Sequence, residues 1–245
     1  MNLFTDDSTD DGVRRRGFLV DGVPGVLWTS PSPSPTPGAP LILSGHGGGL
    51  HKEAAGLVAR AHKLVRDLGY AVAAIDAPGH GDRPRSARDQ QWVDAMLGAR
   101  DRGEPLDPVI AEYNGSLADR AVPEWRATLD ALQQCDEIGV GPVGYTGMTL
   151  ASAIGIPLAA AEPRIGAASF GGIGAHPFVL EAARQVTIPL EFLFPLDDPE
   201  ISRADQLALF DAFASTDKAL LGFPGSHFRV PAERLDTRLF PRTFG

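Results

Sequence analysis

Short apolar runs alternate with amphipathic segments from residue 41 to residue 223, and this alternation limits the folds open to the chain. The segment 50–68, for example, has apolar residues at helical spacing and is followed by Gly69, a typical helix C-cap. Strands that alternate with helices form a mostly parallel, doubly wound α/β sheet with helices on both faces. The expected strands are 41–43, 70–75, 140–145, 165–170, 188–194 and 219–223, and the expected helices are 50–68, 117–134, 150–161 and 203–214.

The segments outside this alternation are polar or rich in turn-forming residues. Residues 1–12 are acidic, and we expect a loose tail there. Two short strands, 17–20 and 26–29, are expected on either side of a turn signal. Residues 82–115 are rich in Arg and Asp and poorly periodic, with one helical piece near 92–97. We expect this segment to cover a pocket.

Length and composition restrict the class of protein. A chain of 245 residues fits one domain, so we take 1–245 as a single unit of the α/β class. The net charge of −9 argues against a nucleic-acid partner, which usually needs a basic face. No stretch approaches the roughly 20 apolar residues of a membrane span, and the N-terminus lacks a signal-peptide pattern. The single cysteine, Cys135, fits a reducing compartment, so we expect a cytoplasmic protein of unknown oligomeric state.

The most informative segment is 141–165, where a strand runs into a turn of small residues and then into a helix. This is the context of the nucleophile elbow, G-x-S-x-G, whose sharp turn needs small residues two positions before and after the nucleophile. Thr149 has Gly147 and Ala151 at these positions, whereas Met148 would crowd a turn centred on Thr146. Thr149 is therefore the best candidate nucleophile.

The elbow sequence VGYTGMTLA resembles VGYxGLSMG of the α/β-hydrolase superfamily, in particular its dienelactone-hydrolase-like and small-esterase branch. The resemblance covers residues 41–230 and implies the α/β-hydrolase fold. It matches Thr149 to the family's serine and Ala151 to its second glycine. Elbow nucleophiles usually have φ > 0, which strains a β-branched residue by about 1–3 kcal/mol. A threonine hydroxyl can still attack a carbonyl, although its methyl group crowds the approach.

A glycine-rich turn, His46-Gly47-Gly48-Gly49, follows the first strand of the alternating region. An HGGG-type turn supplies one backbone N–H to an oxyanion, and the residue after the nucleophile, here Leu150, supplies the other. The resemblance implies that Gly48 is the donor from the turn. A glycine-rich phosphate loop is the weaker alternative, because no Gly-Lys-Ser/Thr follows.

The segment from Asp76 to Arg83, DAPGHGDR, resembles the D-x-P-G-H-G loop of the superfamily. In the family this loop shapes the site without taking part in catalysis. We prefer that role over a metal site formed by His46, His51 and His80, and we expect neither a metal nor a cofactor.

The general base and its acid partner are expected after the last two strands. His227 follows the last strand, where the superfamily has its catalytic histidine, and Asp197, Asp198 and Glu200 follow the strand before it. The family pattern DD-x-x-V/I-P/S matches its second Asp to Asp198. Asp197 stays open as the alternative, and Glu200 is the next candidate. The order Thr149, Asp198, His227 is the order of nucleophile, acid and histidine in this fold.

These residues predict a hydrolase that cleaves a carboxylic ester or a related acyl bond of a small molecule. Two alternatives remain open: a non-hydrolytic acyltransferase, lyase or cyclase on the same fold, and a catalytically silent binding protein. A fluorophosphonate adduct separates the first function from the silent protein, and analysis of the products separates the non-hydrolytic enzymes. We expect substrate contacts from His46, Gly47, Trp92 and His176.

Overall fold

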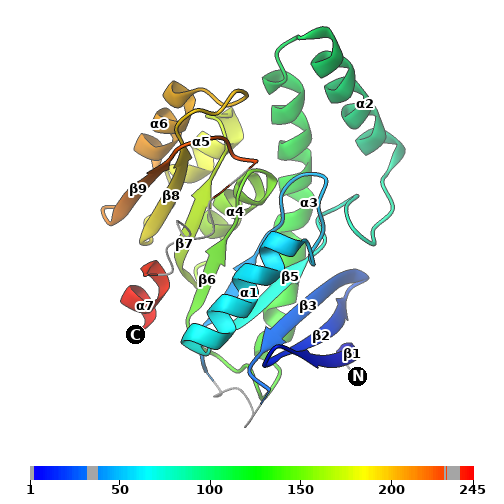
Figure 1. Ribbon diagram of the computed structural model, residues 1–245, viewed down its shortest axis with the longest axis vertical. Coiled ribbons are helices and arrows are strands. Elements are labelled where there is room, and N and C mark those ends of the chain that lie inside the picture. The colour runs from blue at the N-terminus through cyan, green and yellow to red at the C-terminus, as the bar shows by residue number, and fades with distance from the viewer. Residues whose placement is uncertain (1–2, 32–37, 229, 231–237) are drawn as a thin grey trace.

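The computed structural model describes residues 3–31, 38–228, 230 and 238–245. One nine-stranded sheet runs through the molecule in the order β1-β2-β3-β5-β4-β6-β7-β8-β9 (Figure 1). The first three strands form an antiparallel meander, and β3 pairs antiparallel with β5. All the other neighbouring strands are parallel. The strands are β1 (Phe4–Asp10), β2 (Val13–Val20), β3 (Val23–Thr29), β4 (Leu41–Ser44), β5 (Ala71–Ile75), β6 (Val143–Thr146), β7 (Ile165–Gly171), β8 (Leu190–Pro195) and β9 (Lys218–Phe223).

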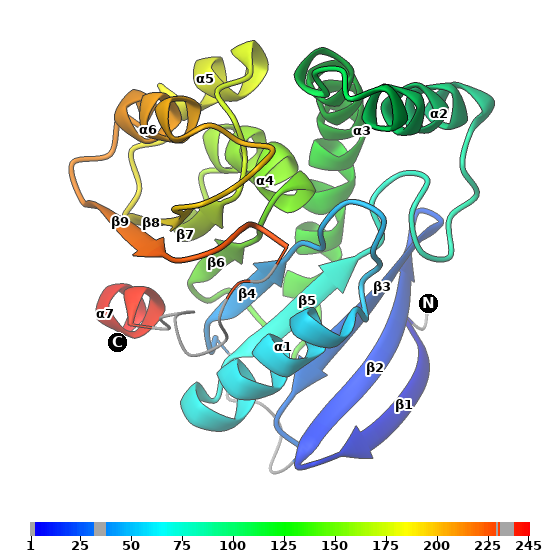
Figure 2. The same cartoon turned by 45° about the horizontal axis from the view of Figure 1, so that its top comes forward.

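Helices cover both faces of the sheet, as Figure 2 shows. On one face, α1 and α7 pack with Ile42, Val72 and Ala74 of the central strands. On the other face, Leu43 and Ala73 join the larger cluster, which includes residues of α3, α4, α5 and α6. The mostly parallel, doubly wound α/β sheet predicted from the sequence is therefore confirmed. The helices are α1 (Ala55–Leu68), α2 (Ala87–Arg102), α3 (Asp107–Gln133), α4 (Leu150–Ala161), α5 (Pro177–Ala183), α6 (Arg203–Ala212) and α7 (Leu239–Phe244).

The expected loose tail at 1–12 is wrong for its described part. Residues Phe4–Asp10 form β1, which pairs antiparallel with β2, and residues 1–2 lie outside the described residues. Apart from the half-buried Phe4, the side chains of β1 are exposed, so the backbone ladder and ion pairs hold this strand. Asp7 pairs with Arg14, and Asp6 pairs with Arg15 at 2.7 Å.

The segment 82–115 is more regular than its sequence pattern indicates, because it contains all of α2 and the first third of α3. Ser86 caps α2 by accepting a hydrogen bond from the Asp89 backbone N–H at 3.1 Å. The buried Asp89 carboxylate accepts two bonds from Arg120 of α3, at 2.6 and 3.1 Å. An aromatic stack of Trp92 on Tyr113, with ring centroids 5.4 Å apart, adds an apolar contact between the two helices.

Within the described residues, none of the helices combines the length and the apolar composition of a bilayer span.

Candidate active site

A cavity of about 760 Å³ opens at the carboxyl ends of the central strands. Ligands bind at this edge in open α/β sheets, and the volume is that of a small-molecule site. The loop after β4, the turn between β6 and α4 and the chain after β9 form one side of the cavity, and α2 and α3 form the other. Residues that line it include His46, Gly47, Gly48, Arg60, Val93, Met96, Tyr113, Thr149, Leu150, Glu200 and His227.

The turn between β6 and α4 has the backbone of a nucleophile elbow. Thr149, the residue before α4, has φ 56° and ψ −117° and is the one β-branched residue with positive φ among those described. Its backbone N–H donates to Gly171 O at 2.9 Å. A Cβ at Gly147 would lie 2.4 Å from the Ala151 Cβ, so this turn requires a glycine at its start. The small residues identified in the sequence therefore have a steric reason.

Ser152, which the sequence places too far into the helix to act as nucleophile, has a structural part in the elbow. Its side chain is fully buried, and its hydroxyl oxygen accepts a hydrogen bond from Gly171 N at 2.8 Å. The hydroxyl also lies 2.9 Å from Gly147 O and 2.8 Å from Gly171 O, where it can donate. These contacts tie the turn to the end of β7.

The Thr149 side chain directs its two branches to different walls of the site. A Cβ added at Gly47 would lie 3.1 Å from Thr149 Oγ1, whereas a Cβ added at Gly172 would lie 3.4 Å from Thr149 Cγ2. The same position at Gly172 is 3.0 Å from His227 Cβ. The hydroxyl therefore faces the glycine-rich loop, while the methyl group and His227 both pack against Gly172.

Asp198 and His227 form a short contact at the cavity wall. His227 Nδ1 lies 2.6 Å from Asp198 Oδ2, and the His227 backbone N–H donates to the same oxygen at 2.7 Å. Asp198 Oδ1 accepts from the backbone N–H groups of Glu200 and Ile201, both at 3.0 Å. Burial opposes ionisation of this carboxyl, but the N–H donors from His227 and Glu200 outweigh it and keep its pKa below the usual value.

The neighbouring Asp197, the alternative acid, lies away from the histidine. Its side chain is 63% exposed and lies 3.5 Å from the Arg203 guanidinium. The side chain also accepts from Gly225 N at 3.3 Å. Asp197 thus ties the turn after β8 to the chain after β9.

Glu200 also reaches the site. Its Oε2 is 4.0 Å from His227 Nε2, and its other carboxylate oxygen accepts from Arg100 of α2 at 3.0 Å. This ion pair joins the covering helix to the turn that carries Asp198.

Both expected oxyanion donors lie at the cavity. Leu150 is the first residue of α4, where a helix has no internal acceptor for the backbone N–H. A Cβ placed at Gly48 would meet no atom within 4 Å, so the backbone there borders open space. Whether these two groups hold an oxyanion stays a prediction.

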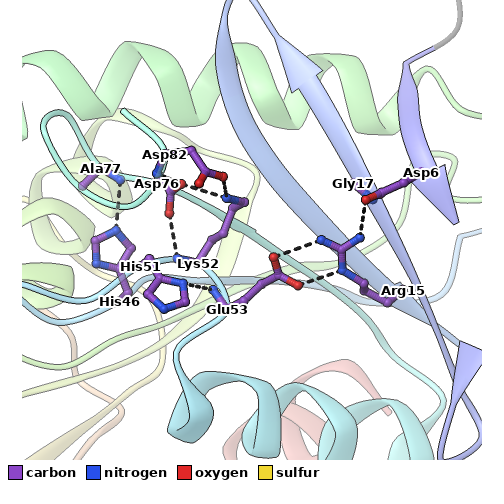
Figure 3. Close-up of polar contacts among 10 residues, drawn as sticks. All are labelled: Asp6, Arg15, Gly17, His46, His51, Lys52, Glu53, Asp76, Ala77 and Asp82. Carbon is purple, nitrogen blue, oxygen red and sulfur yellow. Dashed lines mark hydrogen bonds and ion pairs between the residues drawn. The ribbon is translucent and has the colours of Figure 1, made fainter. Parts of the chain in front are cut away.

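A buried polar network anchors the glycine-rich loop to the loop after β5 (Figure 3). His46 Nε2 accepts from Ala77 N at 3.0 Å, and its Nδ1 lies 2.9 Å from Gly47 O, where a neutral ring donates. Burial lowers the pKa of His46 to about 4, which keeps the ring neutral at neutral pH. Lys52 donates its backbone N–H to one Asp76 oxygen and its ammonium to the other, both at 2.8 Å. The Asp76 loop therefore positions the glycine-rich loop.

The four expected substrate contacts fall into two pairs. His46 and Gly47 line the cavity, although both His46 ring nitrogens are engaged by the backbone. Trp92 and His176 are not among the described residues that line it. Trp92 packs behind the wall on Tyr113, and the buried His176 stacks on Phe178 with ring centroids 6.3 Å apart.

Sequence reasoning missed several residues of the cavity wall, among them Arg60, which periodicity placed on a helix without a role. Among the described residues no group of three or more His, Cys, Asp or Glu side chains is arranged to hold a metal ion.

Comparison with known proteins gives matches among solved structures. Neither the protein-family models nor the curated proteins contain a match. A cold-adapted esterase from an Arctic intertidal metagenomic library is 28% identical, with 100% of both chains covered and a TM-score of 0.78. A dienelactone hydrolase from Anabaena variabilis is 18% identical over 100% of both chains, with a TM-score of 0.63. An esterase from Pyrococcus furiosus is 12% identical, with 95% of this chain and 93% of that chain covered and a TM-score of 0.68. The chain therefore has the α/β-hydrolase fold and is a hydrolase, with esterases among its structural neighbours.

Proposed function

We propose that the protein hydrolyses a carboxylic ester of a small molecule through Thr149, His227 and Asp198. The observation that carries the proposal is the 2.6 Å contact between His227 Nδ1 and Asp198, with Thr149 and His227 packed against the same glycine. A carboxylate on Nδ1 leaves Nε2 free to accept a proton, which is the tautomer that a general base needs. The likeness to the cold-adapted esterase supports an ester as the substrate.

In this mechanism His227 Nε2 takes the Thr149 hydroxyl proton as Oγ1 attacks the carbonyl carbon. The Gly48 and Leu150 N–H groups stabilise the negative oxygen of the tetrahedral intermediate. When the intermediate collapses, the bond to the leaving alkoxide breaks, and His227 returns its proton to that oxygen. Water, deprotonated by the same nitrogen, then attacks the acyl-threonine. As this second intermediate collapses, the bond to Thr149 Oγ1 breaks, His227 returns the proton to Oγ1, and the acid is released.

A second candidate rests on the side-chain orientation of Thr149. Its methyl group and His227 Cβ both lie near Gly172, while its hydroxyl faces Gly47, and within the described residues no hydrogen bond joins the Thr149 hydroxyl to His227. This arrangement favours an enzyme in which His227 activates a bound hydroxyl or water directly, as an acyltransferase or lyase would, with no acyl-threonine. A cytoplasmic location and the absence of a nucleic-acid partner stay predictions from the sequence.

Variants of the nucleophile separate these two functions. We expect Thr149→Ala to abolish hydrolysis of p-nitrophenyl butyrate and Thr149→Ser to match or exceed the wild-type rate, because serine keeps the hydroxyl and removes the methyl group. Thr216→Ala, at an exposed threonine, is the control. Mass spectrometry after fluorophosphonate treatment should find the adduct on Thr149. Full activity of Thr149→Ala, with no adduct on any residue, rejects the acyl-enzyme and leaves the second candidate.

Variants of the acid and the base test the rest of the proposal. We expect His227→Ala to retain less than about a hundredth of the activity, as is typical for loss of a general base. Asp198→Asn should lower kcat far more than Asp197→Asn, because an amide at position 198 can hold the imidazole in the wrong tautomer. Equal, small effects of the two asparagine substitutions would place the acid elsewhere.

A further inference from the structure

Arg60 extends from α1 to the end of β6 and borders the cavity. Its Nη1 donates to Thr146 Oγ1 at 2.5 Å, three residues before Thr149. This bond fixes the guanidinium beside the elbow strand, on the face of the sheet that α1 covers. The side chain is half-buried, with the part that lines the cavity still accessible.

Arg60 differs from the other partly buried arginines because it has no carboxylate partner. The Arg83 guanidinium donates two hydrogen bonds of 2.7 Å to the Glu124 carboxylate, and Arg120 binds the Asp89 carboxylate in the same bidentate way. Within the described part of the chain, no Asp or Glu oxygen lies within 4.0 Å of the Arg60 guanidinium. Among the described residues, its polar contact is to the neutral hydroxyl of Thr146.

The cavity wall carries more positive than negative side chains, although the whole chain is negatively charged. The protein has a net charge of −9, yet the charged residues that line the cavity are Arg60, Arg85, Arg100 and a single acid, Glu200. Glu200 neutralises Arg100, and Arg85 is exposed and bonded to Gln90. Arg60 is thus the partly buried cation of this wall whose charge is uncompensated among the described residues.

Arg60 remains a cation at neutral pH, although burial lowers the pKa of its guanidinium to about 10. Keeping a charge in a poorly solvated place is unfavourable unless an opposite charge reaches it. With Nη1 engaged by Thr146, the Nε and Nη2 edge of the guanidinium has two parallel N–H groups, which is the arrangement that binds a carboxylate.

We propose that Arg60 binds a carboxylate of the substrate, so that the natural substrate is an ester that also carries a free carboxylate, such as the half-ester of a dicarboxylic acid. The proposal rests on the ester hydrolysis proposed above and adds the substrate class. An acidic protein would repel such an anion at most of its surface, and the arginines of the cavity would attract it to the site.

The test compares esters that differ in one charge. Mono-p-nitrophenyl adipate and pimelate are matched with the same esters ending in a carboxamide, and 4-acetoxybenzoate is matched with 4-acetoxybenzamide. The first set puts the carboxylate on the acyl side, and the last pair puts it on the alcohol side. For at least one pair we expect the wild-type kcat/KM to be about ten- to a hundredfold higher for the carboxylate, the usual advantage of a hydrogen bond to a charged group.

Arg60→Gln should reduce this ratio to about one through the KM of the carboxylate ester, with little change for the amide ester. Arg60→Lys should keep part of the preference. Arg66→Gln is the matched control, because it removes the same charge from an exposed position of α1 and should leave the ratio unchanged. Hydrolysis of both members of every pair without a preference, or a preference that survives Arg60→Gln, overturns the proposal.

A binding measurement tests the carboxylate site at Arg60 independently of whether the protein hydrolyses esters. Adipate should raise the Tm of the wild type, and this rise should be absent in Arg60→Gln and present in Arg66→Gln. If no ester is hydrolysed but adipate stabilises the protein through Arg60, the ester hydrolysis fails and the carboxylate site stands. If esters are hydrolysed and adipate has no effect that depends on Arg60, or if inorganic phosphate has the larger effect, the carboxylate site fails.

Discussion

The glycine-rich loop and the covering helix α2 border the same cavity but are held in opposite ways. Buried groups fix the loop: the Asp76 carboxylate is fully buried, Lys52 is 7% exposed, and His46 is 5% exposed. In α2 the buried residues are Asp89 and Ala99 alone, and its link to the far wall ends in the exposed Arg100. The oxyanion donor proposed for the loop needs a fixed position, whereas a segment that covers a pocket, as proposed for α2, has to open for substrate. The buried polar groups are thus concentrated at the glycine-rich loop, whose backbone has to keep its position.

Loss of the Asp76 carboxylate should have the largest effect. Asp76→Ala leaves the Lys52 ammonium buried beside a single remaining acid, so we expect the free energy of unfolding to fall by about 3–5 kcal/mol. Urea denaturation measures this change. Asp82→Ala is the control, because Asp82 contacts the same ammonium with a side chain that is 74% exposed and should contribute less than about 1 kcal/mol. Equal losses in the two variants would show that burial does not distinguish the two carboxylates.

The pH dependence of stability should sharpen the same contrast. The pKa of His46 is about 4 in the folded protein, against 6.5 in an unperturbed histidine. Between these values the unfolded chain binds more protons, so stability is complete above pH 6.5 and falls as the pH drops toward 4. We expect His46 to account for on the order of 2–3 kcal/mol of that fall. In His46→Gln the loss between pH 7 and pH 4.5, measured by urea titrations, should be smaller. An unchanged loss would mean that His46 titrates alike in both states.

The smallest effect is expected at the covering helix. Arg100→Ala removes an exposed ion pair, so the free energy of unfolding should change by less than about 1 kcal/mol. Hydrogen exchange of the α2 amides should nevertheless become about two- to fivefold faster, because the pair joins α2 to the turn at Glu200. Arg102→Ala is the control, since Arg102 pairs with the nearby Glu104 at the end of the same helix. Similar exchange in both variants would exclude the Arg100–Glu200 pair as the contact that stabilises α2.

The sequence predicted the elements whose signals are local. The small residues around Thr149 fix the elbow sterically, and α4 has the predicted bounds, 150–161. Apolar runs located the strands β4 to β9 to within a few residues. The strand β1 escaped prediction because an edge strand held by its backbone needs no apolar pattern. Of helix α2 the sequence predicted only the piece near 92–97, because this helix buries few side chains, and one of those is the carboxylate of Asp89.

Contacts between distant segments explain what the sequence left open in the site. The place after the last strand selected His227, and the family pattern favoured Asp198 with Asp197 left open. Only the fold separates the surroundings of the two aspartates. Spacing placed Arg60 on a helix, yet its reach to Thr146 at the end of β6 depends on how α1 packs on the sheet. Nothing in the spacing of Trp92 and His176 indicated that both lie behind other side chains.

The acidic first strand also bears on how this molecule behaves at high concentration. An open sheet leaves unpaired backbone groups at each outer strand, and a second chain can add there and begin aggregation. On β1 the exposed Asp6, Asp7 and Asp10 would have to lose water before another strand could lie flat against it. Two copies meeting edge to edge would also bring like charges together. These aspartates are the reason why the segment has no recognisable strand pattern. The same side chains disfavour the pairing of a second chain with β1.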